Sequence, residues 1–310
     1  MNIKYRPEID GLRAIAVGAV IIYHAQINIF GYQVLKGGFL GVDIFFVISG
    51  YLISSIIFNE LGQTNQFSFK YFYERRIRRI FPSLLTVMLV SIIFSWIFLL
   101  PDDFRKISES ILSSIGFVSN FYFYFSGLEY DSEIGLFTPF LHTWSLSIEE
   151  QFYLIFPALV FLCFIKYKDK IFFFLVVVTA VSFLLANYSS FYFPSLSFYS
   201  LPTRIWELIL GSLISYKEFK NNNDKRVTLL SNISTIIGLV LIILPFLYLD
   251  DKIAHPSIIT FIPVLGVCLI IHHSSGQEVV SRLLSLKFLV FIGLISYSLY
   301  LWHYPVFAFS

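Results

Sequence analysis

Long apolar runs recur along the whole sequence and limit the folds that this chain can adopt. Several of them approach or exceed the roughly 20 residues that an α-helix needs to cross the hydrocarbon core of a bilayer. The composition agrees, because 57% of the residues are hydrophobic and only 14% are charged. A β-barrel would instead show short segments of alternating hydrophobicity. We therefore expect an all-α fold, a polytopic transmembrane helical bundle, with residues 1–310 as one membrane domain.

The apolar runs predict about nine membrane spans. In chain order these are residues 12–30, 38–58, 81–100, 146–165, 171–187, 202–216, 229–249, 257–272 and 288–309. A further apolar stretch, residues 111–125, is diluted by serine and asparagine. We expect this stretch to lie in the membrane interface or to re-enter the membrane without crossing it.

The basic residues predict the orientation of the chain. If the N-terminus is cytoplasmic, most Lys and Arg residues fall in or beside the cytoplasmic segments 1–13, 70–79, 166–170, 217–226 and 282–287. Cytoplasmic loops of membrane proteins carry such an excess of basic residues. A full crossing by residues 111–125 would move every later loop to the other side and remove this asymmetry.

Arg13 and His24 lie eleven residues apart within the first apolar run. Eleven residues make three helical turns plus about 20°, so both side chains share one helix face, about 16 Å apart along the axis. A cation and an imidazole cost free energy in lipid, so the pair indicates a cavity lined by protein.

Titratable residues of five predicted spans fall at a similar depth, which we call the outer layer. Counted inward from the outer end of each span at 1.5 Å per residue, each lies roughly 6–9 Å beneath the outer surface. The set consists of His24, Asp43, Glu149, Glu150, Glu207 and His303. Function is favoured for His24, and for Asp43, whose side chain is too short to reach the surface. Glu149 and Glu150 fit helix-dipole stabilisation equally well, and His303 fits an aromatic belt equally well.

The chemistry that this outer layer supports is proton transfer. An imidazole that a carboxylate orients is a competent general base. We expect His24 and Asp43 to form such a pair, because neighbouring antiparallel spans joined by a short loop bring equal depths together. The sequence contains no GxSxG nucleophile elbow and no zinc-type cluster, so we expect no metal.

A basic run, residues 73–79, precedes the third predicted span. Arg75 with Arg78, and Arg76 with Arg79, are spaced so that each pair shares a helix face. One interpretation is a topology anchor that binds anionic lipid headgroups. The other is a phosphate clamp, because guanidinium groups bind phosphate bidentately. With Arg13 at the same membrane face, a phosphate-rich cytoplasmic ligand fits the second interpretation.

Several of these stretches together resemble the acyltransferase 3 family of integral-membrane O-acyltransferases. They are YRPEIDGLR at 5–13 with His24 following, GFLGVDIFFVISGYL at 38–52, the basic run 75–79, LHTWSLSIEEQFY at 141–153, RIWEL at 204–208 and SYSLYLWHYP at 296–305. By this resemblance Arg13 and His24 match the family's Arg–His pair, and Arg75, Arg78 and Glu207 match further functional positions. We expect His24 either to deprotonate the acceptor hydroxyl or to carry the acyl group transiently.

The resemblance implies transfer of an acetyl or other short acyl group from cytoplasmic acyl-CoA to a sugar hydroxyl of a cell-surface glycan such as lipopolysaccharide O-antigen or peptidoglycan. Acetyl-CoA is then a co-substrate, and no bound cofactor is expected. The expected partners are acyl-CoA, a cell-surface glycan or lipid-linked sugar, and membrane lipids, without nucleic acid. The expected location is the bacterial inner (cytoplasmic) membrane. The catalytic candidates are His24, Asp43, Glu149, Glu150 and Glu207, and the substrate-binding candidates are Arg13, Arg75, Arg78, Arg204 and His303.

Residues 5–13 and 141–153 are most similar to the subgroup that carries an additional C-terminal, extracytoplasmic SGNH-type domain. We expect these 310 residues to lack that domain and the last span or spans before it. Two functions of other classes stay open. One is a transporter or flippase for a polyprenyl-linked glycan, although the sequence shows no internal repeat. The other is an acyl-CoA-binding membrane protein without turnover.

Overall fold

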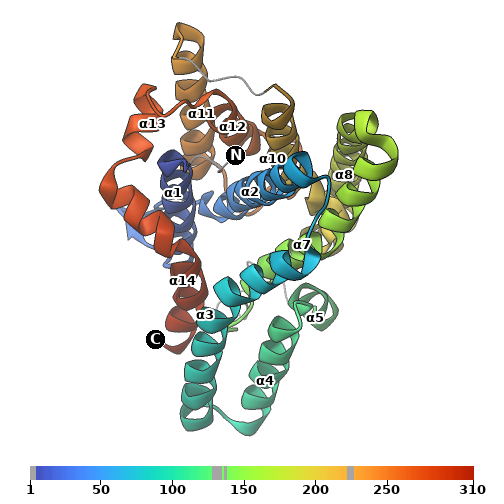
Figure 1. Ribbon diagram of the computed structural model, residues 1–310. Coiled ribbons are helices and arrows are strands. Elements are labelled where there is room, and N and C mark those ends of the chain that lie inside the picture. The colour runs from blue at the N-terminus through green and yellow to red at the C-terminus, as the bar shows by residue number, and fades with distance from the viewer. Residues whose placement is uncertain (1–4, 128–134, 136–137, 222–226) are drawn as a thin grey trace. The chain divides into compact units, whose positions relative to one another are not determined.

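The computed structural model describes residues 5–127, 135, 138–221 and 227–310, and these residues are mostly helical (Figure 1). The helices are α1 Pro7–His24, α2 Gly41–Thr64, α3 Phe69–Phe98, α4 Pro101–Ile115, α5 Ser119–Ser126, α7 Thr143–Tyr167, α8 Ile171–Tyr192, α9 Pro194–Tyr199, α10 Leu201–Asn221, α11 Leu229–Tyr248, α12 Phe261–His273, α13 Val279–Leu284 and α14 Lys287–Phe309. Two 3-10 turns, η1 Gly38–Leu40 and η2 Lys168–Lys170, and a small antiparallel hairpin, β1 Asn28–Ile29 and β2 Tyr32–Gln33, accompany them. The predicted all-α class is confirmed. The basic residues Lys4, Lys225 and Arg226 of the predicted cytoplasmic segments lie outside the described residues.

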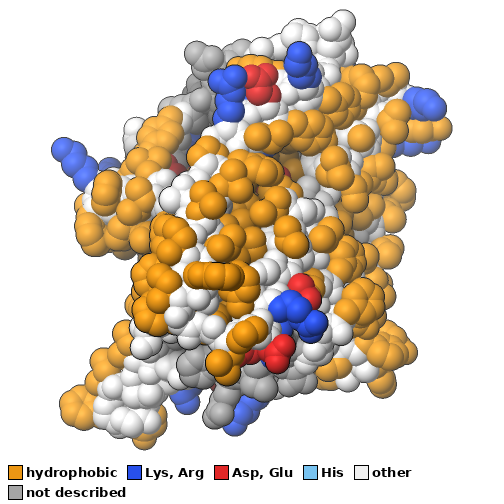
Figure 2. Space-filling model, turned by 90° about the horizontal axis from the view of Figure 1, so that it is seen from below, with side chains coloured by type: hydrophobic (Ala, Val, Ile, Leu, Met, Phe, Trp, Pro, Cys, Tyr) orange, Lys and Arg blue, Asp and Glu red, His pale blue; other side chains and the backbone are white. Residues whose placement is uncertain are grey.

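Five helical stretches among the described residues are long and apolar enough to cross a membrane: Gly38–Thr64, Phe69–Phe98, Thr143–Tyr192, Leu229–Tyr248 and Lys287–Phe309. Hydrophobic side chains cover much of the face shown in Figure 2, and charged side chains occur there in a few small groups. Lipid is the solvent that such a surface fits, since large apolar patches are rare on soluble monomers. The chain is therefore a multi-pass membrane protein. The number of about nine spans stays a prediction.

The first predicted span is not one helix. α1 ends at His24, and the chain then turns into the β1–β2 hairpin, where Phe30 is 95% exposed. Left-handed backbone at Gln26, Phe30 and Gly31 makes the turns that a continuous helix over residues 12–30 would exclude. His24 therefore stands at the end of a helix and not several residues inside it.

The stretch 111–125 is divided between two helices. α4 ends at Ile115, Phe117 adopts left-handed backbone, and α5 begins at Ser119. The helices have 15 and 8 residues, so neither reaches the roughly 20 residues of a membrane crossing. The structure thus agrees with the expectation that this stretch is no ordinary span.

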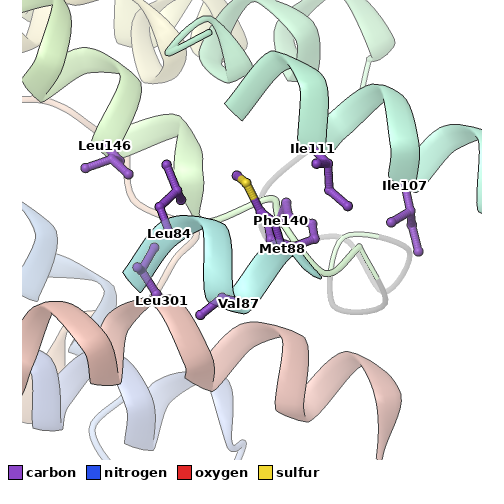
Figure 3. Packing of buried hydrophobic residues seen from close by; sticks show 8 residues of the cluster. All are labelled: Leu84, Val87, Met88, Ile107, Ile111, Phe140, Leu146 and Leu301. Atoms are coloured by element: carbon purple, nitrogen blue, oxygen red, sulfur yellow. The ribbon is translucent and has the colours of Figure 1, made fainter. Parts of the chain in front are cut away.

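The chain divides into two compact units. The first unit contains Met1–Phe67, Phe156–Phe198 and Pro202–Ser296, and the second contains Ser68–Ile155, Tyr199–Leu201 and Tyr297–Ser310. The second unit has a hydrophobic core to which α3, α4, α7 and α14 contribute (Figure 3). Its buried members are Leu84, Val87, Met88, Ile107, Ile111, Phe140, Leu146 and Leu301.

Small residues bring α2 and α10 close together in the first unit. A side chain at Gly50 would collide with the backbone of Leu208, and one at Gly211 would collide with the backbone of α2. Hydroxyl groups then bridge the two helices, with 2.6 Å between the Oγ atoms of Ser54 and Ser212. Small and hydroxyl-bearing residues are the usual contacts between membrane helices. This packing fixes the N-terminal ends of α2 and α10 beside each other, where the candidate site lies.

Candidate functional site

The guanidinium of Arg204 lies at the centre of a buried group of charges in the first unit. Its Nη1 donates to Asp43 Oδ1 at 2.9 Å and to Glu207 Oε1 at 3.3 Å, and its Nε donates to the carbonyl of Phe198 at 3.3 Å. All three charged side chains are 0% exposed. Charges removed from water in this way persist only when they are paired and hydrogen-bonded. Asp43, Arg204, Glu207 and His255, described next, form what we call the charge cluster.

His255 is the member that sequence analysis missed. It lies in the loop between α11 and α12, and its Nε2 is 3.1 Å from both carboxylate oxygens of Asp43. It is two residues before the predicted span 257–272, at the end assigned to the outer face. His24 was selected by counting residues inward from the outer end of each predicted span. The same counting, extended into the outer loops, would have selected His255 as well.

Local sequence explains how the other members meet. Asp43 is in the first turn of α2, where the helix dipole favours a carboxylate. Arg204 and Glu207 are three residues apart in α10 and so share one helix face. The two helices run parallel, because Asp43 contacts Arg204 near their starts while Tyr51 donates to Glu218 further along, at 2.8 Å.

One carboxylate oxygen of the charge cluster has no described donor. Glu207 Oε2 is buried and accepts from no side-chain or backbone donor among the described residues, while the Asp43 carboxylate lies within hydrogen-bond reach of the Glu207 carboxyl group. Buried polar atoms are nearly always paired, so an open acceptor in a charged site requires an explanation. A proton on Glu207, shared with the neighbouring Asp43 carboxylate, would supply one.

His24 lies near the charge cluster but further toward the end of α1. Gly38 packs against Ala19 and Tyr23, and Gly41 packs against Ala16, so α2 runs antiparallel to α1. This register places Asp43 about two helical turns, roughly 10 Å, from the level of His24. The prediction named His24 as the imidazole partner of Asp43, whereas the hydrogen bonds described for Asp43 go to Arg204 and His255.

Aromatic rings connect His24 with the charge cluster. The ring of His24 is 5.2 Å from that of Tyr23, Tyr23 is 5.6 Å from Phe39, and Phe39 is 5.2 Å from His255. His24 itself is 7% exposed and is followed by the exposed Gln26. His24 is therefore the last residue of α1 and lies two residues before the exposed turn at Gln26.

Arg13 lies in the other half of α1. Its Nη1 is 3.4 Å from Asp10 Oδ1, and its side chain is 12% exposed. The structure therefore separates Arg13 from His24 along the helix, as their spacing predicts.

The second unit corrects the predicted outer layer. Arg76 of the basic run donates to Glu150 Oε1 at 3.0 Å, and its guanidinium lies 4.0 Å from the ring centre of Tyr153. The sequence analysis had placed the basic run at the cytoplasmic face and Glu150 near the outer one. The reason for the error is that α3 begins at Phe69 and packs antiparallel to α7, so that Tyr73 donates to the carbonyl of Leu154 at 3.0 Å. Glu149 lies in the same region, where it accepts from Tyr153 at 2.9 Å.

The predicted pair Arg75 and Arg78 lies on the surface of the second unit. Arg78 is 78% exposed and forms an ion pair with Glu74 one turn earlier. Arg75 lies 5.0 Å from the ring centre of Tyr71, which is itself exposed. These two guanidinium groups are accessible, whereas Arg76 is occupied by Glu150.

His303 belongs to a buried aromatic group in the second unit. Its ring is 5.2 Å from that of His142, which in turn stacks on Tyr304. His142 is 0% exposed and His303 is 5% exposed. His303 therefore faces the interior of this unit, and the aromatic-belt interpretation does not fit its burial.

Comparison with known proteins decides the family. The profile of the family described as an acyltransferase domain matches residues 6–310. The chain belongs to this acyltransferase family. Among its relatives are peptidoglycan O-acetyltransferase OatA of Listeria monocytogenes, 36% identical over 98% of this chain and 49% of the relative, and O-acetyltransferase OatA of Staphylococcus aureus, 34% identical over 99% and 51%. No solved structure matches the chain.

This acyltransferase-family chain spans about half the length of the curated relatives it matches. The matched region contains both the charge cluster and the basic run, since it begins at residue 6 and extends to residue 310. The predicted site residues therefore all lie within the family domain.

Proposed function

We propose that this chain is the membrane domain of an O-acetyltransferase that moves an acetyl group from cytoplasmic acyl-CoA to a hydroxyl of peptidoglycan at the outer face of the bacterial cytoplasmic membrane. The observation that carries the proposal is the family match over residues 6–310. The name of the Listeria relative favours peptidoglycan over lipopolysaccharide as the acceptor. The buried charges of an otherwise apolar chain support a reaction site, because ionisable groups inside membrane segments are costly and usually functional.

The reaction breaks the thioester C–S bond, forms an O–C bond to the sugar, and returns the hydroxyl proton to the CoA thiolate. His24 is the proposed group for this proton, or the transient carrier of the acetyl group. It suits either role because it stands at the end of α1 beside exposed residues, whereas the charge cluster is closed. In this proposal Asp43, Arg204 and Glu207 supply a fixed electrostatic framework beneath His24, which needs no reorganisation during the reaction.

Arg75 and Arg78 are the proposed contacts for the phosphates of CoA. Their exposure supports this role, since an exposed ion pair such as Arg78–Glu74 is worth only about 0–1 kcal/mol and is easily exchanged for a phosphate. Arg13, in the first unit, is a separately proposed substrate-binding residue. A cytoplasmic N-terminus, which this proposal includes, places these groups on the side where acyl-CoA is found.

The test uses proteoliposomes that contain the full chain, with acetyl-CoA labelled in the acetyl group on one side and soluble peptidoglycan fragments on the other. Mass spectrometry of the fragments should show labelled O-acetyl groups, and omission of acetyl-CoA should remove them. Movement of lipid-linked glycan across the membrane without acetylation would overturn the proposal in favour of a transporter. Binding of acetyl-CoA without any transfer would overturn it in favour of a binding protein.

A further inference from the structure

His255 has both ring nitrogens engaged within the charge cluster. Its Nδ1 is 3.0 Å from Arg204 Nη2, and its Nε2 is 3.1 Å from each oxygen of Asp43 and 3.3 Å from Arg204 Nη1. A guanidinium can only donate and a carboxylate can only accept. The shorter contacts therefore assign a neutral imidazole whose Nδ1 accepts from Arg204 and whose Nε2–H donates to Asp43.

The surroundings of His255 favour the same neutral form. Burial and the Arg204 charge lower the pKa of His255, and the Asp43 carboxylate opposes them only in part. The ring is 8% exposed and lies between the rings of Phe39, at 5.2 Å, and Phe198, at 5.8 Å. An imidazole enclosed in this way stays in one orientation.

The loop that carries His255 is held on both sides. Before His255, the hydroxyl of Tyr23 in α1 donates to Asp251 at 2.8 Å. After His255, the backbone N–H of Ile258 donates to the side chain of Asn187 in α8 at 2.7 Å. α1 and α8 thus fix the height at which the imidazole enters the charge cluster. Tyr23 also precedes His24, so the same loop is tied to the end of α1 that carries the proposed reacting group.

We propose that His255 is a positioning residue of the acetyl-transfer site, which it serves by holding Asp43 through Nε2–H and Arg204 through Nδ1. This inference rests on the proposed function. His255 is not a proton acceptor for substrate, because neither ring nitrogen is open. Its effect passes through Asp43, which it holds in place beside Arg204 Nη1.

Two amide variants separate the two hydrogen bonds. In His255→Gln the amide reaches the position of Nε2 and keeps a donor for Asp43, whereas in His255→Asn the amide reaches only the position of Nδ1 and keeps an acceptor for Arg204. Loss of a hydrogen-bond partner one step removed from the reacting groups costs roughly 10- to 100-fold at metal sites, and we expect a fall of that order here. Arg204 keeps its bonds to Asp43, Glu207 and the Phe198 carbonyl without His255, whereas Asp43 loses one of its two described partners. We therefore expect kcat to fall more in His255→Asn and His255→Ala than in His255→Gln. The KM for acetyl-CoA should change by less than about twofold in all three, since CoA phosphates bind elsewhere.

Two controls distinguish positioning from folding and from failure of the proposed function. His273→Asn alters another imidazole of the first unit, one that bonds to the Leu269 carbonyl of its own helix, and should leave kcat unchanged. Added imidazole should partly restore His255→Ala, because that variant leaves an imidazole-sized space. A double-mutant cycle of His255→Asn with Asp43→Asn, followed by thermal unfolding, reports their coupling without any turnover.

The inference stands if the Gln variant outperforms the Asn variant and the cycle shows coupling. It is overturned if wild-type protein transfers acetyl and all three His255 variants retain its kcat. Absence of acetyl transfer by the wild type would refute the proposed function instead. In that case additive melting temperatures in the cycle would also overturn the positioning of Asp43 by His255.

Discussion

Replacement of Arg204 by methionine removes the cation of the charge cluster while filling much of its volume. The fully buried carboxylates of Asp43 and Glu207 then lose their shared partner, and the Phe198 carbonyl and His255 lose a donor. Removing one partner of a buried pair costs about 3–5 kcal/mol. Lysine keeps the charge but cannot reach all these acceptors at once, so Arg204→Lys should cost about 2 kcal/mol, or about 1 kcal/mol for each of two lost hydrogen bonds.

Thermal unfolding in detergent measures these costs. At about 2–4 °C per kcal/mol, Arg204→Met should lower the Tm by roughly 6 °C or more. The matched control is Arg78→Ala, whose exposed ion pair is worth about 0–1 kcal/mol. Adding Asp43→Asn to Arg204→Met should recover part of the loss, because one unpaired charge disappears. A Tm for Arg204→Met within about 2 °C of the control would refute the view that this cluster is a tightly coupled buried ion pair.

Three further outcomes follow from packing and charge. Gly50→Ala should lower the free energy of unfolding by about 1–3 kcal/mol, because the new methyl group meets the backbone of α10. The control is Gly18→Ala, whose new methyl group enters open space and should be neutral or stabilising in the same unfolding assay. Burial raises the pKa of Glu278, but hydrogen bonds from nearby serines lower it to about 2. The stabilisation by Glu278 is therefore present above about pH 4.5 and is lost as the pH falls toward 2. Glu278→Gln should cost up to about 3 kcal/mol in free energy of unfolding at pH 7 and little at pH 2.5. An equal cost at both pH values would contradict this. Arg76→Ala should cost roughly 3 kcal/mol by leaving Glu150 unpaired, and Glu150→Gln in the same chain should recover part of it; additive losses would show that the ion pair does not form.

The fold class and most helices could be predicted because membrane helices require long apolar runs, and nothing else in the sequence competes with that requirement. The end of α1 could not be predicted from hydropathy, since Ile27, Ile29 and Phe30 are apolar but exposed in and beside the hairpin. Hydropathy alone does not distinguish an apolar turn from an apolar helix. The left-handed backbone at Gln26 and Phe30 is the physical reason that the helix stops.

Part of the candidate site could also be predicted. Asp43 and Glu207 were chosen as charges inside apolar runs and Arg204 as a substrate-binding residue, and the structure brings all three together. His255 was missed because it lies in a loop, where a histidine carries no hydropathy signal. Depth counted from assumed span ends failed for Glu150, because α3 extends well before the apolar run that marked its predicted start.

Acetyl transfer by a His24→Ala variant tests the central claim most directly. Wild-type and variant chains are compared in proteoliposomes with labelled acetyl-CoA, at matched amounts of inserted protein and with His273→Ala as the control imidazole. The account predicts that His24→Ala inserts normally and transfers no acetyl to peptidoglycan fragments, while the control transfers at the wild-type rate. Full transfer by His24→Ala would contradict the assignment of the reaction to the end of α1.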